Sequence, residues 1–248
     1  MKKTLFKIFG PLRMLYKIYY AIVFLLIAIP MYPIFYFLLK SDKYAHQAFK
    51  MKRVWALILA ILTLTFVKTI RPEDMPKAPY VICANHTSYL DIVVMFFAIP
   101  ETFLFLGKAE LLKWPVVRIF FRNSDIPVDR TNRAKAKQSI ELTKEAVEKG
   151  FSIAIFPEGL IPMEDTPKMT PFKNGAFVLA ISKQVPILPL TFMTNYKLFS
   201  HESDLFGAGS PGLAKVYVHS PISTKGLTTD NLEELKQKTY DTIASKLP

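Results

Sequence analysis

The sequence predicts an α/β protein in which a mostly parallel, helix-covered sheet follows an N-terminal pair of membrane-associated helices. Three observations support this fold class. After residue 70, short apolar runs typical of buried strands alternate with segments of helical composition. Before residue 70 lie two long apolar segments. Basic residues flank both of those segments, a pattern typical of helices beside anionic membrane surfaces.

Composition narrows the class of protein further. Apolar residues make up 51% of the 248 residues, which excludes a disordered chain. Lys and Arg number 32 against 20 Asp and Glu, a net charge of +12. Such a charge favours an anionic partner: nucleic acid, a membrane surface or a phosphorylated substrate. Cys83 is the one cysteine, so the chain forms no intramolecular disulfide and no cysteine-built zinc site.

The two N-terminal apolar segments differ in length. Residues 18–39 form 22 positions without a formal charge, enough to cross a hydrocarbon core of about 30 Å, but Pro30 and Pro33 interrupt them. Residues 54–67 form only 14 such positions, which favours a buried or interfacial helix. Basic clusters precede, separate and follow the segments: Lys2, Lys3, Lys7, Arg13 and Lys17; Lys40, Lys43, Lys50, Lys52 and Arg53; Lys68, Arg71 and Lys77.

These basic clusters favour membrane attachment without a crossing. Basic loops stay cytoplasmic, so a single crossing would place one cluster on the wrong side. A helical pair inserted into one leaflet keeps all three clusters near anionic headgroups, at about 1 kcal/mol per charge. We therefore expect residues 1–70 to hold the chain on the cytoplasmic face of a membrane, the inner membrane in a bacterium. A transmembrane helix, or two buried helices of a soluble core, are the alternatives. Nucleic acid is disfavoured because no zinc-finger spacing or aromatic-basic RNA signature is present.

Residues 71–248 are expected to form the α/β domain. Strands are predicted at residues 80–83, 102–106, 151–156, 187–192 and 215–219, and helices at 132–149, 172–182 and 230–246. Gly150 follows the first of these helices, where a C-terminal glycine is expected. Cys83 falls within a predicted strand, which favours a buried apolar role over that of a nucleophile. Loops at the carboxyl ends of such strands are where ligands usually bind.

The segment Asn85-His86-Thr87-Ser88-Tyr89-Leu90-Asp91 directly follows the first of these strands. If a helix begins at Ser88, His86 lies in the turn before it and Asp91 lies in its first turn. The Asp91 carboxylate can then hold one ring nitrogen of His86 while the other nitrogen takes a proton. A capping box formed by Ser88 and Asp91 explains the same spacing without chemistry. Both interpretations stay open on the residues alone.

Three further segments accompany this one. They are Asp125-Ile126-Pro127-Val128-Asp129-Arg130, Phe156-Pro157-Glu158-Gly159 and Val185-Pro186-Ile187-Leu188-Pro189-Leu190. In this order, from Pro79 to Leu190, the four blocks resemble the glycerolipid acyltransferase family that includes 1-acylglycerol-3-phosphate acyltransferases. The resemblance implies an α/β acyltransferase domain on a membrane-associated helical element. The sequence itself contains no metal-ligand cluster and no Gly-rich nucleotide-binding signature, so no metal or other cofactor is expected.

The resemblance assigns roles by position. It implies that His86 is the general base and Asp91 its orienting partner. Arg130 looks like a phosphate-binding residue, because a guanidinium group offers a fork for phosphate oxygens. Further contacts are implied for Glu158 and Gly159, which would shape the acceptor site, and for Lys173, a second phosphate contact. The simpler alternatives are a solvated charge at Arg130, an ordinary turn at 158–159 and an exposed lysine at 173.

The reaction implied by the resemblance moves a fatty acyl group from acyl-CoA or acyl carrier protein to the 2-hydroxyl of 1-acylglycerol 3-phosphate, forming phosphatidic acid. One departure bears on the acceptor. The family's third block usually continues Gly-Thr-Arg, whereas Gly159 is followed by Leu160, Ile161 and Pro162, so the arginine normally assigned to the acceptor phosphate is missing. An aminolipid acceptor without the phosphate is therefore the alternative substrate. A lipid hydrolase would need a serine elbow that the sequence lacks, and a purely lipid-binding protein would not need His86 with Asp91.

Overall fold

One seven-stranded sheet forms the centre of the protein in the computed structural model, which describes residues 2–129, 131–162, 166–201 and 204–248. The strand order is β1-β7-β6-β2-β5-β3-β4. Strands β2 to β6 are parallel, while β7 is antiparallel to β6 and parallel to β1. The bounds are β1 Thr65–Ile70, β2 Val81–Ala84, β3 Phe103–Lys108, β4 Ile126–Val128, β5 Ser152–Ile155, β6 Ile187–Phe192 and β7 Gly212–Val218. The carboxyl ends of β2 to β6 therefore share one edge with the amino ends of β1 and β7.

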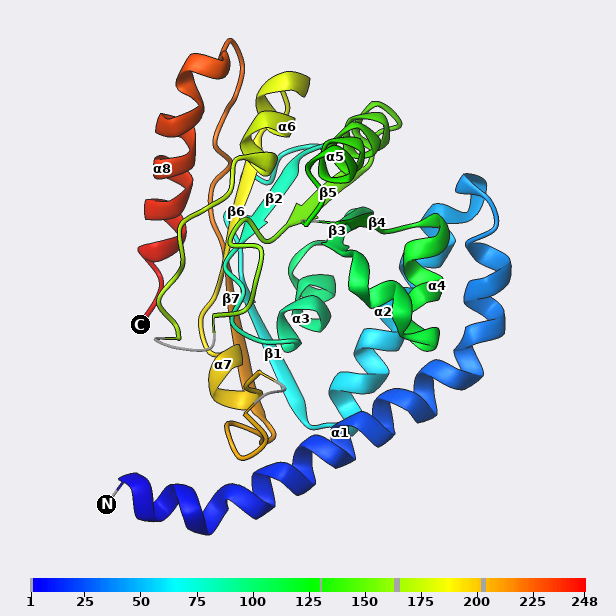
Figure 1. Cartoon of the computed structure of the whole chain (residues 1–248), viewed down its shortest axis with the longest axis vertical. Coiled ribbons are helices and arrows are strands. Elements are labelled where there is room, and N and C mark those ends of the chain that lie inside the picture. The colour runs from blue at the N-terminus through cyan, green and yellow to red at the C-terminus, as the bar shows by residue number, and fades with distance from the viewer. Residues whose placement is uncertain (1, 130, 163–165, 202–203) are drawn as a thin grey trace.

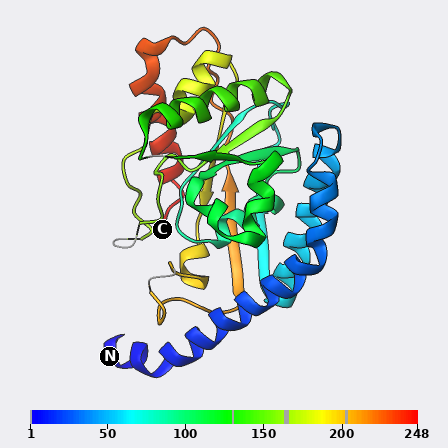
Figure 2. The same cartoon turned by 45° about the vertical axis from the view of Figure 1, so that its right-hand side comes forward.

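Helices cover both faces of the sheet (Figures 1 and 2). On one face, α1 (Lys2–Leu38), α2 (Ala45–Leu62), α3 (Leu90–Ala98) and α4 (Pro115–Asn123) pack around one apolar core. On the other, α5 (Arg133–Glu148), α6 (Gly175–Lys183) and α8 (Leu232–Ala244) enclose a second core. The four-residue α7 (Asn195–Leu198) lies beyond the carboxyl end of β6. Single 3₁₀ turns occur at Asp42–Tyr44, Ala109–Lys113 and Thr229–Asn231. The predicted α/β class is confirmed.

Local sequence explains where several elements begin and end. The strands of the core are rich in branched apolar residues, and every residue of β2, β5 and β6 is buried. The side chain of Asn132 caps α5 by accepting hydrogen bonds from the N–H groups of Ala134 and Lys135. Gly150 follows that helix with φ +89°, the left-handed conformation that glycine adopts at little cost. The predicted helix end at Gly150 is confirmed.

The N-terminal segment differs from the sequence prediction in two respects. α1 continues through Pro30 and Pro33 to Leu38, so these prolines do not end it, and it curves around the molecule (Figure 1). Prolines inside a helix each remove one hydrogen bond and favour such bending. The second apolar segment is not one helix, because α2 ends at Leu62 and β1 begins at Thr65. β1 ends at Ile70 and pairs with β7 along six residues, so the predicted segment 1–70 contributes an edge strand.

A buried ion pair ties the N-terminal helices to the sheet. Lys52 of α2 donates from Nζ to Asp125 Oδ2 and to Ser124 Oγ, both at 2.9 Å, and its side chain is 4% exposed. Asp125 Oδ1 also accepts from the N–H of Phe105, at 3.0 Å. The sequence placed Lys52 among cations facing lipid headgroups. That prediction is wrong for Lys52, because a carboxylate inside the fold takes its charge.

Two arginines from the same predicted clusters bind the end of α3. Arg71 donates to the carbonyl oxygens of Phe97 and Ala98, and Arg53 donates to that of Pro100 at 3.2 Å. Cations at a helix C-terminus satisfy its last carbonyls and complement its dipole. These contacts hold the N-terminal helices and the segment after β1 against α3, the helix that follows the candidate catalytic turn.

Candidate active site

The candidate site lies where β2 ends and α3 begins. His86 Nδ1 is 3.0 Å from Asp91 Oδ2, in the arrangement predicted for a base and its orienting carboxylate. Asp91 is fully buried, whereas His86 is 15% exposed. The His86 ring stacks on Phe156, with the ring centroids 4.0 Å apart. Asp91 therefore holds Nδ1, and Nε2 is the nitrogen left to exchange a proton.

Asp91 also organises the backbone of the turn. Its Oδ2 accepts hydrogen bonds from the N–H groups of Thr87, at 2.6 Å, and Ser88, at 2.9 Å. The Ser88 N–H bond is one half of the predicted capping box. The other half is not formed, because Ser88 Oγ accepts from the N–H of Leu90 rather than from that of Asp91. The capping and histidine-holding roles of Asp91 therefore coexist.

Glu158 connects this turn to a second loop. Its Oε1 accepts from the N–H of His86 at 2.8 Å, and its Oε2 accepts from the N–H and Oγ of Thr170 at 2.7 and 3.1 Å. Burial raises the pKa of the Glu158 carboxyl, although these hydrogen bonds oppose the shift. With both oxygens engaged inside the protein, Glu158 braces the His86 turn.

Gly159 and Lys173 lie together beside Glu158. Gly159 has φ +76°, and a Cβ added there would lie 2.9 Å from Lys173 Nζ. The Lys173 N–H also donates to the carbonyl oxygen of Pro157 at 2.8 Å. Glycine therefore lets the lysine side chain lie across the turn, next to the exposed Leu160 that replaces the family's usual residue. Arg130, the predicted phosphate-binding residue, lies outside the described residues.

Two buried asparagines complete the site. Asn85 exchanges two hydrogen bonds with the backbone of Phe192, at 2.7 and 3.1 Å, and so joins the ends of β2 and β6. Asn195, on α7, donates from Nδ2 to Asp91 Oδ1 at 2.7 Å. Sequence reasoning missed Asn195, although its place three residues after a strand at the carboxyl edge is a usable signal.

Cys83 is fully buried within β2, and burial raises the pKa of its thiol. The predicted burial is confirmed, and a thiolate nucleophile is disfavoured.

Comparison with known proteins agrees with this geometry. The acyltransferase family model matches residues 66–193, which contain the β2–α3 turn and the Glu158 loop. The chain belongs to the acyltransferase family. Membership confirms the resemblance seen in the four sequence blocks.

Individual members of this family are similar to the chain over much of its length. It is 32% identical to the 1-acyl-sn-glycerol-3-phosphate acyltransferase of Saccharomyces cerevisiae over 73% of this chain and 59% of that protein. It is 34% identical to the Mus musculus 1-acyl-sn-glycerol-3-phosphate acyltransferase alpha over 64% and 55% of the respective lengths. The chain thus spans less than two thirds of these relatives.

A crystal structure shows the same fold over nearly the whole chain. It is that of the 1-acyl-sn-glycerophosphate (LPA) acyltransferase PlsC from Thermotoga maritima, with a TM-score of 0.75. The match covers 96% of this chain and 94% of that one at 23% sequence identity. At that identity the likeness establishes the fold, including the N-terminal helices.

Proposed function

We propose that this protein transfers a fatty acyl group from the thioester of acyl-CoA or acyl carrier protein to the 2-hydroxyl of 1-acylglycerol 3-phosphate, forming phosphatidic acid. The hydrogen bond between His86 Nδ1 and Asp91 Oδ2 carries the proposal. It leaves His86 Nε2 as the base, with a buried carboxylate to stabilise the imidazolium. The names of the family relatives support the choice of acceptor.

The reaction follows from this pair. The acceptor hydroxyl gives its proton to His86 Nε2 as its oxygen attacks the thioester carbonyl. The tetrahedral intermediate then collapses, the carbon–sulfur bond breaks, and the thiolate takes the proton from Nε2. One proton therefore enters and leaves the histidine in each turnover, and Asp91 stays ionised throughout.

A phosphate-bearing acceptor is supported by the charges around the Gly159 turn. Lys173 lies across that turn, so its ammonium group compensates for the arginine that is missing at Ile161. Arg130 is the second cation of the proposed phosphate site. The missing arginine, at Ile161, is the one observation that favours an aminolipid acceptor instead.

Attachment to a membrane is the second part of the proposal. Within the described chain, Phe9–Leu38 of α1 is the one stretch long and apolar enough to cross a membrane by length and composition. Most of this stretch is not buried in the protein, and α2 is also apolar on its outer side. The exposed apolar side chains include Leu12, Leu15, Ile22, Leu26 and Ile29 of α1 and Leu57 and Ile61 of α2. We propose that both helices insert into the cytoplasmic leaflet.

The position of α1 brings the membrane close to the site. Tyr20 of α1 contacts the ring of Phe199 with the centroids 4.9 Å apart, and Ser88 Oγ donates to the Phe199 carbonyl at 2.7 Å. A lipid leaving the leaflet beside α1 therefore meets the carboxyl edge of the sheet, where His86 lies.

The test offers the purified full chain 1-acylglycerol 3-phosphate and, in parallel, an aminolipid acceptor without phosphate, each with labelled oleoyl-CoA or oleoyl acyl carrier protein. We expect phosphatidic acid as the faster-formed product. Arg130→Ala should lower kcat/KM for the phosphate acceptor, by an amount that corresponds to about 1.5–3 kcal/mol of lost transition-state stabilisation. Arg130→Lys should restore part of that loss. Lys137→Ala, an exposed cation on α5, is the control. Faster acylation of the aminolipid, or unchanged kinetics of the Arg130→Ala variant, would contradict the phosphate acceptor and favour the aminolipid.

A further inference from the structure

A cavity of about 590 Å³ lies between the first half of α1 and the loop that precedes β7. Its walls come from Phe9, Leu12, Arg13, Leu15, Tyr16 and Tyr19 of α1, from Lys197 of α7 and from residues 208–211. The volume falls within the range of about 300–1,000 Å³ that small-molecule sites occupy. Neither His86 nor Asp91 lines this cavity, so it is distinct from the proposed catalytic site.

Contacts within the protein hold both walls of the cavity in place. Tyr16 and Tyr19 each donate a hydrogen bond of 2.7 Å to a carbonyl oxygen at the end of α2, those of Thr63 and Leu62. On the opposite wall, a Cβ at Gly209 would lie 2.6 Å from the Arg13 carbonyl oxygen, so only glycine lets the loop come this close to α1. The cavity is therefore part of the packing of α1 onto the domain.

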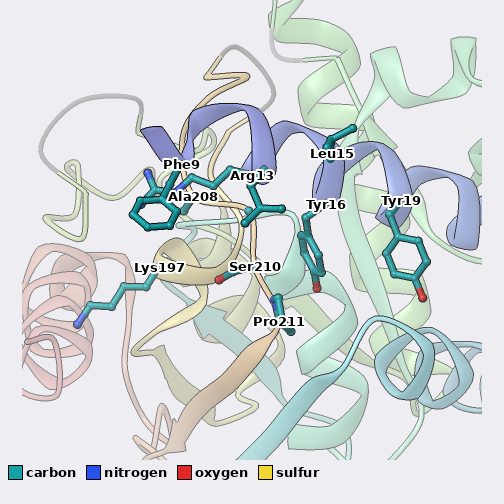
Figure 3. Close-up of a pocket in the computed structure, with 11 residues that line it drawn as sticks. Phe9, Arg13, Leu15, Tyr16, Tyr19, Lys197, Ala208, Ser210 and Pro211 are labelled. Atoms are coloured by element: carbon teal, nitrogen blue, oxygen red, sulfur yellow. The ribbon is translucent and has the colours of Figure 1, made fainter. Parts of the chain in front are cut away.

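The lining is apolar along α1 and positively charged at one end. Leu12 and Leu15 are 62% and 58% exposed, so the apolar wall continues into the outer face of α1. The side chains of Arg13 and Lys197 extend toward the same end (Figure 3). An apolar wall that ends in two cations complements a molecule with a long hydrocarbon chain and an anionic head.

We propose that this cavity binds one anionic phospholipid of the bilayer, with an acyl chain along Leu12, Leu15 and Tyr16 and the phosphate between Arg13 and Lys197. The inference rests on the proposed membrane attachment of α1, which places the open side of the cavity in the leaflet. Lys197 and Asn195 share the short helix α7, and Asn195 contacts Asp91. The bound lipid therefore lies on the opposite side of α7 from the proposed catalytic carboxylate.

The experiment measures lipid retention by the full chain in detergent, using native mass spectrometry with phosphatidylglycerol and phosphatidylcholine supplied together. We expect one retained phosphatidylglycerol per chain. The double variant Arg13→Gln/Lys197→Gln should weaken that retention at least about tenfold, because two charge contacts to the phosphate are lost. Ala208→Phe, which fills the cavity without changing the charge, should weaken it as much.

The matched control is Lys40→Gln/Lys43→Gln, which removes two exposed cations from the connection between α1 and α2, at the far end of α1 from the cavity. Its retention of phosphatidylglycerol should change less than about twofold. Equal losses in the control and the Arg13/Lys197 variant would mean general attraction to the basic surface and would overturn the site. Unchanged retention in Ala208→Phe would do the same.

Two measurements on the native chain keep this test separate from the proposed function. Flotation with phosphatidylcholine vesicles reports membrane attachment, and the acyl-transfer assay reports the reaction. A native chain that floats and acylates but retains no phosphatidylglycerol overturns the lipid site alone. A chain that retains the lipid but transfers no acyl group overturns the reaction alone.

Discussion

Asn195 Nδ2 donates a 2.7 Å hydrogen bond to Asp91 Oδ1, and both side chains are fully buried. The bond crosses 104 residues of chain and occupies the carboxylate oxygen that His86 does not use. The other contact to that oxygen, from Thr87 Oγ, is a long 3.5 Å. No donor among the described residues reaches Asn195 Oδ1. The bond from Nδ2 to Asp91 is therefore the side-chain hydrogen bond that fixes the orientation of this amide. Asn195 is therefore placed to orient Asp91.

Asn195→Leu tests this positioning role. Leucine has a similar size and shape to asparagine but no hydrogen-bond donor, so the Asp91 carboxylate loses one of the contacts that fix its orientation. We expect kcat to fall about tenfold with little change in KM, because Asn195 contacts Asp91 rather than substrate. Tyr196→Phe, also on α7, is the control for damage to that helix. An unaltered kcat in a folded Asn195→Leu variant would limit the residue to a packing role.

His86→Ala removes the proposed base. We expect the rate of acyl transfer to fall by about 10²–10⁴, because the group proposed to take the proton from the acceptor hydroxyl is lost. Steady-state rates with labelled oleoyl-CoA measure the loss, and circular dichroism checks the fold. His46→Ala, an exposed histidine bonded to Thr102, should keep native rates. Native-like turnover without His86 would end the catalytic interpretation of the turn.

Asp91→Asn separates catalysis from helix capping. The amide of asparagine keeps one acceptor oxygen, so it can still accept a hydrogen bond from the N–H of Thr87 or Ser88. It has no negative charge, so it cannot stabilise an imidazolium. We expect at least about a hundredfold loss of kcat together with a stability loss of about 1–3 kcal/mol. Urea unfolding and turnover are measured on the same sample, with the exposed Asp42→Asn as the control. Reduced stability with native turnover would leave only the capping role.

Lys52→Met tests the buried ion pair that joins α2 to Asp125. Removing the cation leaves a buried carboxylate uncompensated, which typically costs about 3–5 kcal/mol of unfolding free energy. Adding Asp125→Asn should recover most of the loss, because the neutral amide still accepts from the N–H of Phe105. Lys149→Met, which breaks an exposed pair with Asp42, should leave the unfolding free energy nearly unchanged. A loss no larger than this control's would show that the Lys52 pair contributes little.

His219 predicts how stability depends on pH. Thr191 Oγ donates to the carbonyl oxygen of Ile243, so it accepts from the Nε2–H of a neutral His219 at 2.8 Å. Burial, helped by Lys246, lowers the pKa of His219 to about 4 from an ordinary 6.5. Between these two values the unfolded chain binds more protons, so the unfolding free energy falls as pH drops from 6.5 toward 4.

The size of this effect is on the order of 1–2 kcal/mol, since nearby solvent screens part of it. His219→Gln keeps an N–H donor near the Nε2 position and cannot titrate. Urea unfolding of both proteins at several pH values should show a shallower slope for the variant between pH 4 and 6.5. Parallel slopes would assign the acid sensitivity to other groups.

The periodicity of apolar residues was enough to place most of the α/β domain. Mostly apolar runs at 187–192 and 151–156 form buried parallel strands, because strands covered on both faces carry apolar residues at nearly every position. The turn holding His86 and Asp91 was also readable, since both residues lie within one short segment between a strand and a helix. Local pattern carries such features because the groups that interact are near neighbours in the chain.

Long-range packing settled what local pattern could not. Residues 54–67 are expected to form one apolar helix, yet Thr65–Ile70 pair with β7, some 147 residues away, and β-strand pairing outweighs local preference. From the sequence, Lys52 is expected to bind lipid headgroups, but in the folded protein its Nζ lies 2.9 Å from Asp125 Oδ2. Asn195 carried no local motif, and its role depends wholly on the folding of α7 against Asp91. Each of these contacts joins residues far apart in the chain, so its energy exists only once the sheet has formed.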